Sequence, residues 1–285
     1  MKKITGLLLA VLMLIALFTG CSNTDNAGGG SSTDANLSGV VKTGGSTSVE
    51  KVILALIYQF QDDNRSVTID YEANGSGDGI KNTISGLYEI GHSSRELKTD
   101  GSENGLDATA YAIDGIAIVV NKANGVGNLT KEQLQKIYTG EITNWKDVGG
   151  NDSLISPITR EPSSGTRDAF AEIIGLEKGG SNIIASASVA DNTGAIQTQV
   201  SQNPNAIGYM SFSDVDDSKV STVKYEGISI STSTLKDGTY KLKREFFLLT
   251  KTGATLSLPA KAFKDFVMSE AGQKIVSDNK LLPIK

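Results

Sequence analysis

Residues 157–170 read PITREPSSGTRDAF, and this stretch indicates both how the chain folds and what it binds. The preceding residues 154–159 favour a short strand, which Pro162 ends. A helix then follows, because Phe170, Ile173 and Ile174 lie at helical spacing after a turn rich in N-cap residues. The stretch therefore predicts a strand, a polar turn and a helix in succession.

The start of this helix has the composition of an anion-binding site. The N–H groups of a first helical turn have no partner within the helix and carry the positive end of its dipole. Gly165 lets an oxyanion approach the backbone, and Ser164 and Thr166 add hydroxyl donors. Arg160 can bring a forked guanidinium from the strand. An ordinary capped helix beside a surface arginine explains the same residues equally well, so the remaining chain has to decide.

Three similar turns, rich in hydroxyls or glycine, follow strand-like segments earlier in the chain. They are TGGSTS at residues 43–48, NGSGDG at 74–79 and SSR at 93–95. Apolar side chains at helical spacing follow the first turn in residues 49–60, and Ser48 or Thr47 is the expected cap of that helix. Capping and turn formation explain each loop singly. Together, four such turns indicate a binding site, because open α/β sheets bind ligands at the carboxyl ends of their strands.

The N-terminus has the features of an export signal. Two lysines precede an apolar run at residues 4–18 that is short for a transmembrane helix, so residues 1–20 are predicted to be a lipoprotein signal peptide. Cys21 follows directly and is the only cysteine, which indicates a lipid attachment site. Residues 21–38 are rich in small polar residues and are expected to be a flexible tether.

The composition disfavours several classes of function. A formal net charge of −5 without a basic run gives little attraction to a phosphate backbone, so no nucleic-acid partner is expected. His92 is the only histidine, which disfavours a zinc site and a Ser-His-Asp nucleophile. Neither a metal nor a cofactor is expected, and the protein is predicted not to be an enzyme.

About 250 residues follow the tether, which is too many for one simple core and suits two lobes. Residues 111–121 and 242–250 contain runs typical of buried strands and are predicted to cross between the lobes. The first lobe is then residues 39–115 with 250–285, and the second is residues 116–249. Further helices are expected at residues 129–138, within 183–200 with a cap near Asp191, and at 259–277. Trp145, the only tryptophan, is expected to anchor packing.

Several segments, in this order and at these spacings, resemble the phosphate-binding lipoproteins of the bacterial phosphate-specific uptake system. They are GSTS at 45–48, GSGDGI at 75–80, IGHSSREL at 90–97, DGIA at 114–117, IYTGEITNW at 137–145, REPSSGT at 160–166 and IGY at 207–209. No one string is specific, but the ordered set covers essentially the whole mature chain. The resemblance implies a two-lobed α/β fold of the periplasmic-binding-protein type II, with two crossover segments and a ligand cleft between the lobes.

The resemblance also implies which residues hold the anion. The family's binding groups correspond here to Thr47, Ser48, Ser76, Arg160, Ser164, Gly165 and Thr166. Many members have an aspartate in the third loop that accepts the proton of hydrogen phosphate, whereas this chain has Ser94 followed by Arg95, both expected near the ligand. Asp78 is a substitute acceptor, or else only a carboxylate at a helix start. Glu161 ranks behind it, because a neighbour of Arg160 at a strand end is expected to point away.

The expected function is the capture of inorganic phosphate and its delivery to the permease and ATPase subunits of an ABC transporter. The receptor is expected to be a monomer, anchored by lipid on the extracytoplasmic face of the cell membrane, whose lobes close on the anion. A receptor for sulfate, molybdate or another oxyanion is the alternative of the same class. A surface phosphatase or other hydrolase is the alternative of a different class, which the single histidine disfavours.

Overall fold

The computed structural model describes residues 37–284 of the 285-residue chain. The predicted signal peptide, Cys21 and nearly all of the predicted tether lie outside the described residues. Leu37 already packs against a hydrophobic core. Between residues 37 and 284, no helix is long and apolar enough to cross a membrane.

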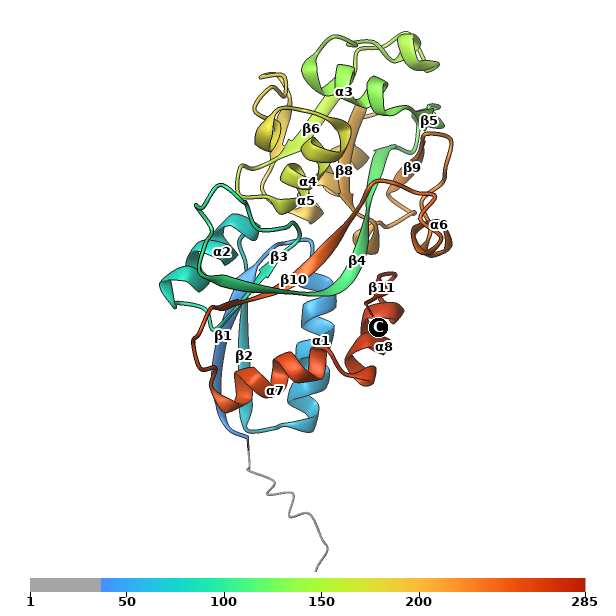
Figure 1. Ribbon diagram of the computed structural model, residues 1–285. Coiled ribbons are helices and arrows are strands. Elements are labelled where there is room, and N and C mark those ends of the chain that lie inside the picture. The colour runs from blue at the N-terminus through green and yellow to red at the C-terminus, as the bar shows by residue number, and fades with distance from the viewer. Residues whose placement is uncertain (1–36, 285) are drawn as a thin grey trace, which may run out of the picture. The chain divides into compact units, whose positions relative to one another are not determined.

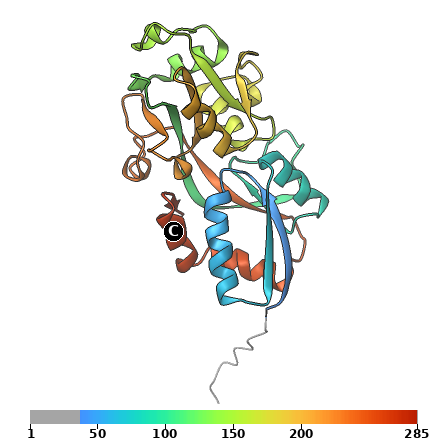
Figure 2. The same cartoon turned by 180° about the vertical axis from the view of Figure 1, so that it is seen from behind.

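The first lobe is built on three parallel strands. β1 (Gly39–Gly45) lies between β2 (Val67–Ala73) and β3 (Ile90–Ser93) and pairs with both. Four helices cover this sheet (Figures 1 and 2): α1 (Glu50–Asp63), α2 (Ser76–Ser85), α7 (Leu258–Val267) and α8 (Glu270–Asp278). Helix α1 forms because its apolar residues recur at helical spacing, and the buried ones are Val52, Ile53, Leu56, Ile57 and Phe60.

Two long antiparallel strands connect the lobes (Figure 1). β4 (Leu106–Asn121) pairs with β10 (Lys243–Lys251), and Asp114 lies directly opposite Arg244 in this pair. Buried apolar side chains of β4 before Asp114 belong to the first core, and those after Gly115 belong to the second. The strands follow the order β2-β1-β3-β10-β4-β8-β6-β7, in which β8 (Ala206–Ser211), β6 (Ser156–Arg160) and β7 (Ser188–Ala190) belong to the second lobe. The two predicted crossover segments and the two-lobed type II α/β fold are therefore confirmed.

The second lobe contains most of the remaining elements. They are β5 (Asn128–Leu129), α3 (Lys131–Thr139), η1 (Trp145–Val148), β6 (Ser156–Arg160), α4 (Gly165–Ile174), η2 (Lys178–Gly180), β7 (Ser188–Ala190), α5 (Thr193–Gln202), β8 (Ala206–Ser211), η3 (Phe212–Asp214), β9 (Val220–Tyr225) and α6 (Thr232–Lys236). A final short strand, β11 (Leu282–Pro283), pairs with β4.

Aromatic packing holds in place helix α4, which begins within residues 157–170. Phe170 of α4 stacks on Tyr209 of β8 with ring centroids 3.9 Å apart, and Tyr138 packs edge-on against both rings. Trp145 is buried, and its indole Nε1–H donates to the carbonyl of Asn205 at 3.0 Å, which confirms its predicted packing role. The start of α4 is thus held on a rigid core.

The predicted cap of α1 is wrong. The N-cap residue is Val49, and no side chain caps the helix. Ser48 and Thr47 are buried, and their hydroxyls bond to the second lobe instead. A side chain occupies one rotamer, so a hydroxyl directed across the cleft is not placed to accept from the N–H groups of the first helical turn.

The predicted C-terminal helix is two helices, α7 and α8. Ser269 separates them and caps α8 by accepting from the N–H of Gly272 at 3.2 Å. Gly272 lies so close to the end of α7 that a Cβ there would come within 2.2 Å of the Phe266 carbonyl oxygen. The absence of a side chain at this position permits the sharp break.

The single histidine is a neutral core residue. His92 is fully buried on β3, and its Nε2 lies 2.7 Å from Thr43 Oγ1, whose own proton goes to the Ile90 carbonyl. The Nε2 atom therefore carries the proton in this bond. Burial lowers the pKa of His92 from its usual 6.5 to about 3.

We expect His92 to make the fold sensitive to mild acid. Below pH 6.5 the unfolded chain binds a proton that the folded chain excludes, so this contribution to stability is present above pH 6.5 and declines as the pH falls. Relative to His92→Gln, the wild type should lose about 1 kcal/mol of unfolding free energy between pH 6.5 and 5.5. Urea unfolding at the two pH values measures this.

The comparison with the variant matters because burial also raises the pKa of Asp214 to about 7, and that group has the opposite sign. Its contribution is common to both proteins and cancels in the difference. Parallel pH dependence of wild type and His92→Gln would show that the folded protein accepts the imidazole proton.

Candidate anion-binding site

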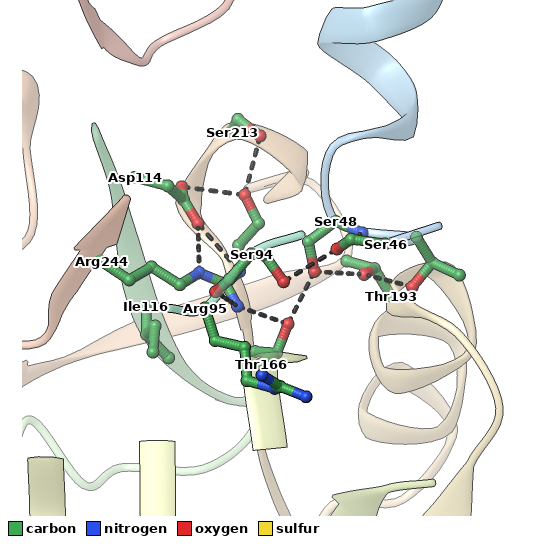
Figure 3. Close-up of polar contacts among 12 residues, drawn as sticks. Ser46, Ser48, Ser94, Arg95, Asp114, Ile116, Thr166, Thr193, Ser213 and Arg244 are labelled. Atoms are coloured by element: carbon green, nitrogen blue, oxygen red, sulfur yellow. Dashed lines mark hydrogen bonds and ion pairs between the residues drawn. The ribbon is translucent and has the colours of Figure 1, made fainter. Parts of the chain in front are cut away.

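Three loops of the first lobe meet at one edge of its sheet. They follow β1, β2 and β3, and because these strands are parallel their carboxyl ends lie side by side. Ser46 Oγ donates to Ser94 Oγ at 2.8 Å (Figure 3). Ser76 Oγ lies 3.2 Å from Ser94 Oγ. All three serines are buried. The loops that the sequence singled out are therefore in contact with one another.

Two loops of the second lobe supply the opposite wall. The parallel strands β6 and β7 lead into α4 and α5. Ser164 caps α4 by accepting from the N–H of Arg167, as the sequence predicted. Thr166 and Thr193 lie in the first turns of the two helices, and both are buried.

Hydroxyl groups join the two walls. Ser48 Oγ lies 2.7 Å from Thr166 Oγ1 and 3.0 Å from Thr193 Oγ1 (Figure 3). The N–H of Gly77 also donates to the carbonyl of Ser163 at 2.9 Å. We call the following residues the hydroxyl cluster: Ser46, Thr47, Ser48, Ser76, Ser94, Thr166 and Thr193. The cluster is a buried set of short polar side chains between the lobes.

Arg160 ends β6 and enters the cluster. Its Nη2 donates to Thr47 Oγ1 at 2.8 Å and its Nη1 to Thr193 Oγ1 at 3.2 Å, and the residue is 1% exposed. The expectation that Glu161 points away is wrong, because its carboxylate accepts from Nε and Nη2 of Arg160 at 2.8 Å each. Strand alternation no longer applies there, since β6 ends at Arg160 and Glu161 lies in the turn. The guanidinium thus has a carboxylate on one side and hydroxyls on the other.

Gly165 is a point of close approach between the lobes. A Cβ at this position would lie 2.3 Å from Ser76 Oγ and 2.7 Å from Ser94 Oγ, both in the first lobe. The glycine therefore permits the first turn of α4 to reach the hydroxyl cluster.

Two other predicted residues are not joined to the cluster. Arg95 follows Ser94, but its guanidinium makes ion pairs with Glu103 at 2.6 Å and Asp168 at 2.8 Å. Burial opposes its charge, yet these two carboxylates outweigh it and raise the pKa of Arg95. Asp78 is half-buried in the first turn of α2, and within residues 37–284 no hydrogen bond or ion pair reaches its carboxylate.

Two residues that the sequence reasoning missed belong to the same place. Thr193 follows β7 through the turn DNTG, which carries the same signal as the other loops, but a three-residue strand is too short to recognise. Arg244 lies on β10 between the exposed residues Lys243 and Glu245, and its Nη1 donates to Thr166 Oγ1 at 2.6 Å. The available signal was strand alternation, which puts Arg244 on the same face as Leu242 and Phe246.

The chemistry of this site is that of capture. The hydroxyls and the Arg160 and Arg244 guanidinium groups can donate to an oxyanion, and carboxylates hold the far side of each guanidinium. The one histidine is occupied with Thr43, and in the part of the chain that the structure describes no group of His, Cys, Asp and Glu could hold a metal. The site offers an anion hydroxyl and guanidinium donors from both lobes.

Comparison with known proteins also indicates a solute-binding protein. Residues 30–271 match a family model described as a PBP superfamily domain. The chain is 33% identical over 297 residues to the phosphate-binding protein PstS of Bacillus subtilis, covering 99% of this chain and 94% of that protein. It is 28% identical over 293 residues to PstS of Borreliella burgdorferi, covering 100% of both.

Two solved structures are similar over their whole length. One is a putative phosphate ABC transporter substrate-binding protein with bound phosphate from Clostridium perfringens, at 42% identity and a TM-score of 0.83, covering 87% of this chain and 100% of that one. The other is an ABC-type phosphate transport receptor from Vibrio cholerae, at 35% identity and a TM-score of 0.72, covering 85% and 99%. The chain therefore belongs to the PstS family of phosphate-binding proteins, within the PBP superfamily.

Proposed function

We propose that this protein binds inorganic phosphate between its lobes and delivers it to an ABC transporter for import. The observation that carries the proposal is the hydroxyl cluster, closed across the lobes, with the Arg160 guanidinium directed into it. The phosphate-bound relative from Clostridium perfringens supports the choice of anion. Family members bind solutes and do not transform them, and this chain acts in the same way.

The proposed contacts combine the predicted residues with one new member. Phosphate lies among hydroxyls and backbone N–H groups of both lobes, and Arg160 supplies the principal countercharge. The contacting residues are Thr47, Ser48, Ser76, Ser94, Ser164, Gly165, Thr166 and Thr193. Hydrogen bonds to a charged group contribute roughly 1.5–3 kcal/mol each, so five of them contribute roughly 7.5–15 kcal/mol, the same order as the roughly 8 kcal/mol of micromolar binding.

Calorimetry of the folded body, residues 37–285, with phosphate, sulfate and molybdate tests the proposal. We expect one phosphate per chain with micromolar or tighter affinity, and weaker binding of the other two anions. Tighter binding of sulfate or molybdate than of phosphate would make the protein a receptor for that anion. An absence of binding for all three would overturn the oxyanion assignment.

Selectivity for phosphate over sulfate is proposed not to depend on Asp78. Its carboxylate has no bond to the hydroxyl cluster, so its role is to stabilise the start of α2. We expect Asp78→Asn to leave the ratio of phosphate to sulfate affinity within about threefold of the wild-type ratio. Calorimetry with both anions measures the ratio. A large gain in sulfate binding alone would mean that Asp78 accepts the phosphate proton.

The protein is proposed to be a monomer held on the extracytoplasmic face of the cell membrane by a lipid on Cys21, where it delivers phosphate to the permease subunits that the ATPase subunits drive from the other side. Cys21→Ala should release the protein from membranes without changing phosphate affinity, because residues 21–38 separate the lipid from the binding body. Fractionation followed by immunoblotting measures release, and Ser22→Ala serves as the control. A Cys21→Ala protein that stays with the membrane would contradict lipid anchoring at this residue.

A further inference from the structure

We propose that Arg244 is a positioning residue of the anion site, which orients the Thr166 hydroxyl toward the bound oxyanion and is itself held by Asp114. The proposal rests on the proposed function of the site. It concerns a cation on a crossing strand, outside the loops that supply the other binding groups.

The ion pair of Arg244 and Asp114 lies where the crossing strands join the lobes. Arg244 and Asp114 are directly opposite in the antiparallel pair of crossing strands. Nε and Nη2 of Arg244 donate to Asp114 Oδ2 at 3.2 and 3.0 Å. Asp114 is fully buried and lies between the buried residues of the first core and those of the second. The guanidinium is therefore fixed at the junction of the lobes.

Further contacts leave this guanidinium little freedom. Ser211 Oγ donates to Asp114 Oδ1 at 2.9 Å and lies 2.8 Å from Ser213 Oγ. The guanidinium carbon lies 5.3 Å from the centroid of the Phe246 ring, which backs it from the same strand. A charge supported in this way costs little reorganisation when a ligand arrives.

The end of Arg244 that does not contact Asp114 bonds to both lobes. Nη1 donates to Thr166 Oγ1 at 2.6 Å and to the carbonyl of Ser94 at 3.4 Å, so it touches both lobes (Figure 3). An arginine is only a donor, and a hydroxyl has one proton. Because Thr166 accepts from Arg244, its proton is available to Ser48, which lies 2.7 Å away, or to a bound oxyanion.

Arg160 and Arg244 are held in the same way, with a carboxylate on one side and hydroxyls on the other. Arg160 donates to Thr47 and Thr193 while Glu161 holds its other side, and Arg244 donates to Thr166 while Asp114 holds its other side. Each guanidinium is paired with one carboxylate, so the four charges sum to zero and the excess donors are directed into the hydroxyl cluster. Burial raises the pKa of Asp114, and Arg244 and the Ser211 hydroxyl act against that shift.

The test is a double-mutant cycle that avoids leaving a buried carboxylate alone. Arg244→Met with Asp114→Asn removes both charges and keeps the volume, so the fold is retained. Phosphate should bind this protein at least tenfold more weakly than wild type. Thr166→Val should cost at least tenfold in wild type but at most threefold in the charge-free background, because its hydroxyl is no longer oriented.

The control is an exposed pair of one cation and one carboxylate on another part of the first lobe. Lys274→Met with Asp278→Asn on α8 should leave phosphate affinity unchanged. A second variant, Arg244→Lys, keeps a charge beside Asp114 but not the forked bridge to Thr166, and should also weaken phosphate at least tenfold. Circular dichroism and thermal unfolding confirm that each protein is folded.

The outcomes separate this inference from the proposed function. Suppose that the wild type binds phosphate, that the Arg244→Met/Asp114→Asn protein binds it with an affinity within threefold, and that the losses in the cycle are additive. The proposed role of Arg244 is then wrong, while the proposed function stands. Wild type that binds no phosphate, sulfate or molybdate overturns the proposed function, and Arg244 then orients no hydroxyl for an anion.

Discussion

Replacing Arg160 by alanine is expected to weaken phosphate binding at least a hundredfold, a loss of about 3 kcal/mol. The guanidinium is buried and donates to Thr47 and Thr193, one in each lobe, so the variant loses the principal countercharge and two oriented hydroxyls. It also leaves the Glu161 carboxylate without its partner beside a dianion. Titration calorimetry measures the loss.

Two further variants show how much of the lost affinity comes from Arg160 itself and how much from the unpaired Glu161 carboxylate. Arg65→Ala removes an arginine that is exposed and paired with Asp62, and it should leave the affinity unchanged. Arg160→Ala with Glu161→Ala should bind phosphate more tightly than Arg160→Ala alone, because the unpaired carboxylate is gone. If Arg160→Ala bound phosphate as tightly as wild type, Arg160 would not belong to the site.

Gly165→Ala is expected to reduce phosphate affinity by a similar factor without destabilising the unliganded protein. The added methyl group would lie 2.3 Å from Ser76 Oγ and 2.9 Å from Ser76 Cβ, so rotating the hydroxyl does not remove the clash. Both atoms belong to the opposite lobe, and alanine suits the first turn of α4. The substitution therefore opposes closure of the lobes and leaves each lobe intact.

Thermal unfolding without phosphate and calorimetry with phosphate measure the two effects separately. Gly125→Ala is the matched control, because a Cβ there meets no atom within 4 Å. Affinity of Gly165→Ala within threefold of wild type would refute the close approach of the lobes on the ligand. A lower unfolding temperature in the absence of phosphate would instead place the strain inside the second lobe.

Local chemistry explains why much of the site could be predicted from the sequence. A strand, a polar turn and a capped helix are set by residues a few positions apart, so Ser164, Gly165 and Thr166 could be recognised within residues 157–170 as donors at a helix start. Parallel strands bring their carboxyl ends to one edge, so the loops at Ser48, Ser76 and Ser94 could be expected to meet there without knowledge of the fold's details.

Some assignments failed because a side chain had two possible partners. Ser48 suits a helix cap as well as a contact across the cleft, and only the position of the second lobe selects the contact with Thr166 and Thr193. Arg95 follows Ser94 directly, yet Glu103 and Asp168 are the carboxylates within its reach. Adjacent residues can lie in one loop and still direct their side chains to different partners.

The sequence by itself determined the α/β class, the two crossings, the polar turns and the resemblance to a family, because these follow from periodicity and local spacing. Tertiary structure alone decided the roles of Arg244 and Asp114. They lie 130 residues apart in sequence, and only the register of β10 against β4 sets them opposite each other. Register depends on how both lobes pack, and a strand's own residues do not reveal which neighbour its charged side chain will meet.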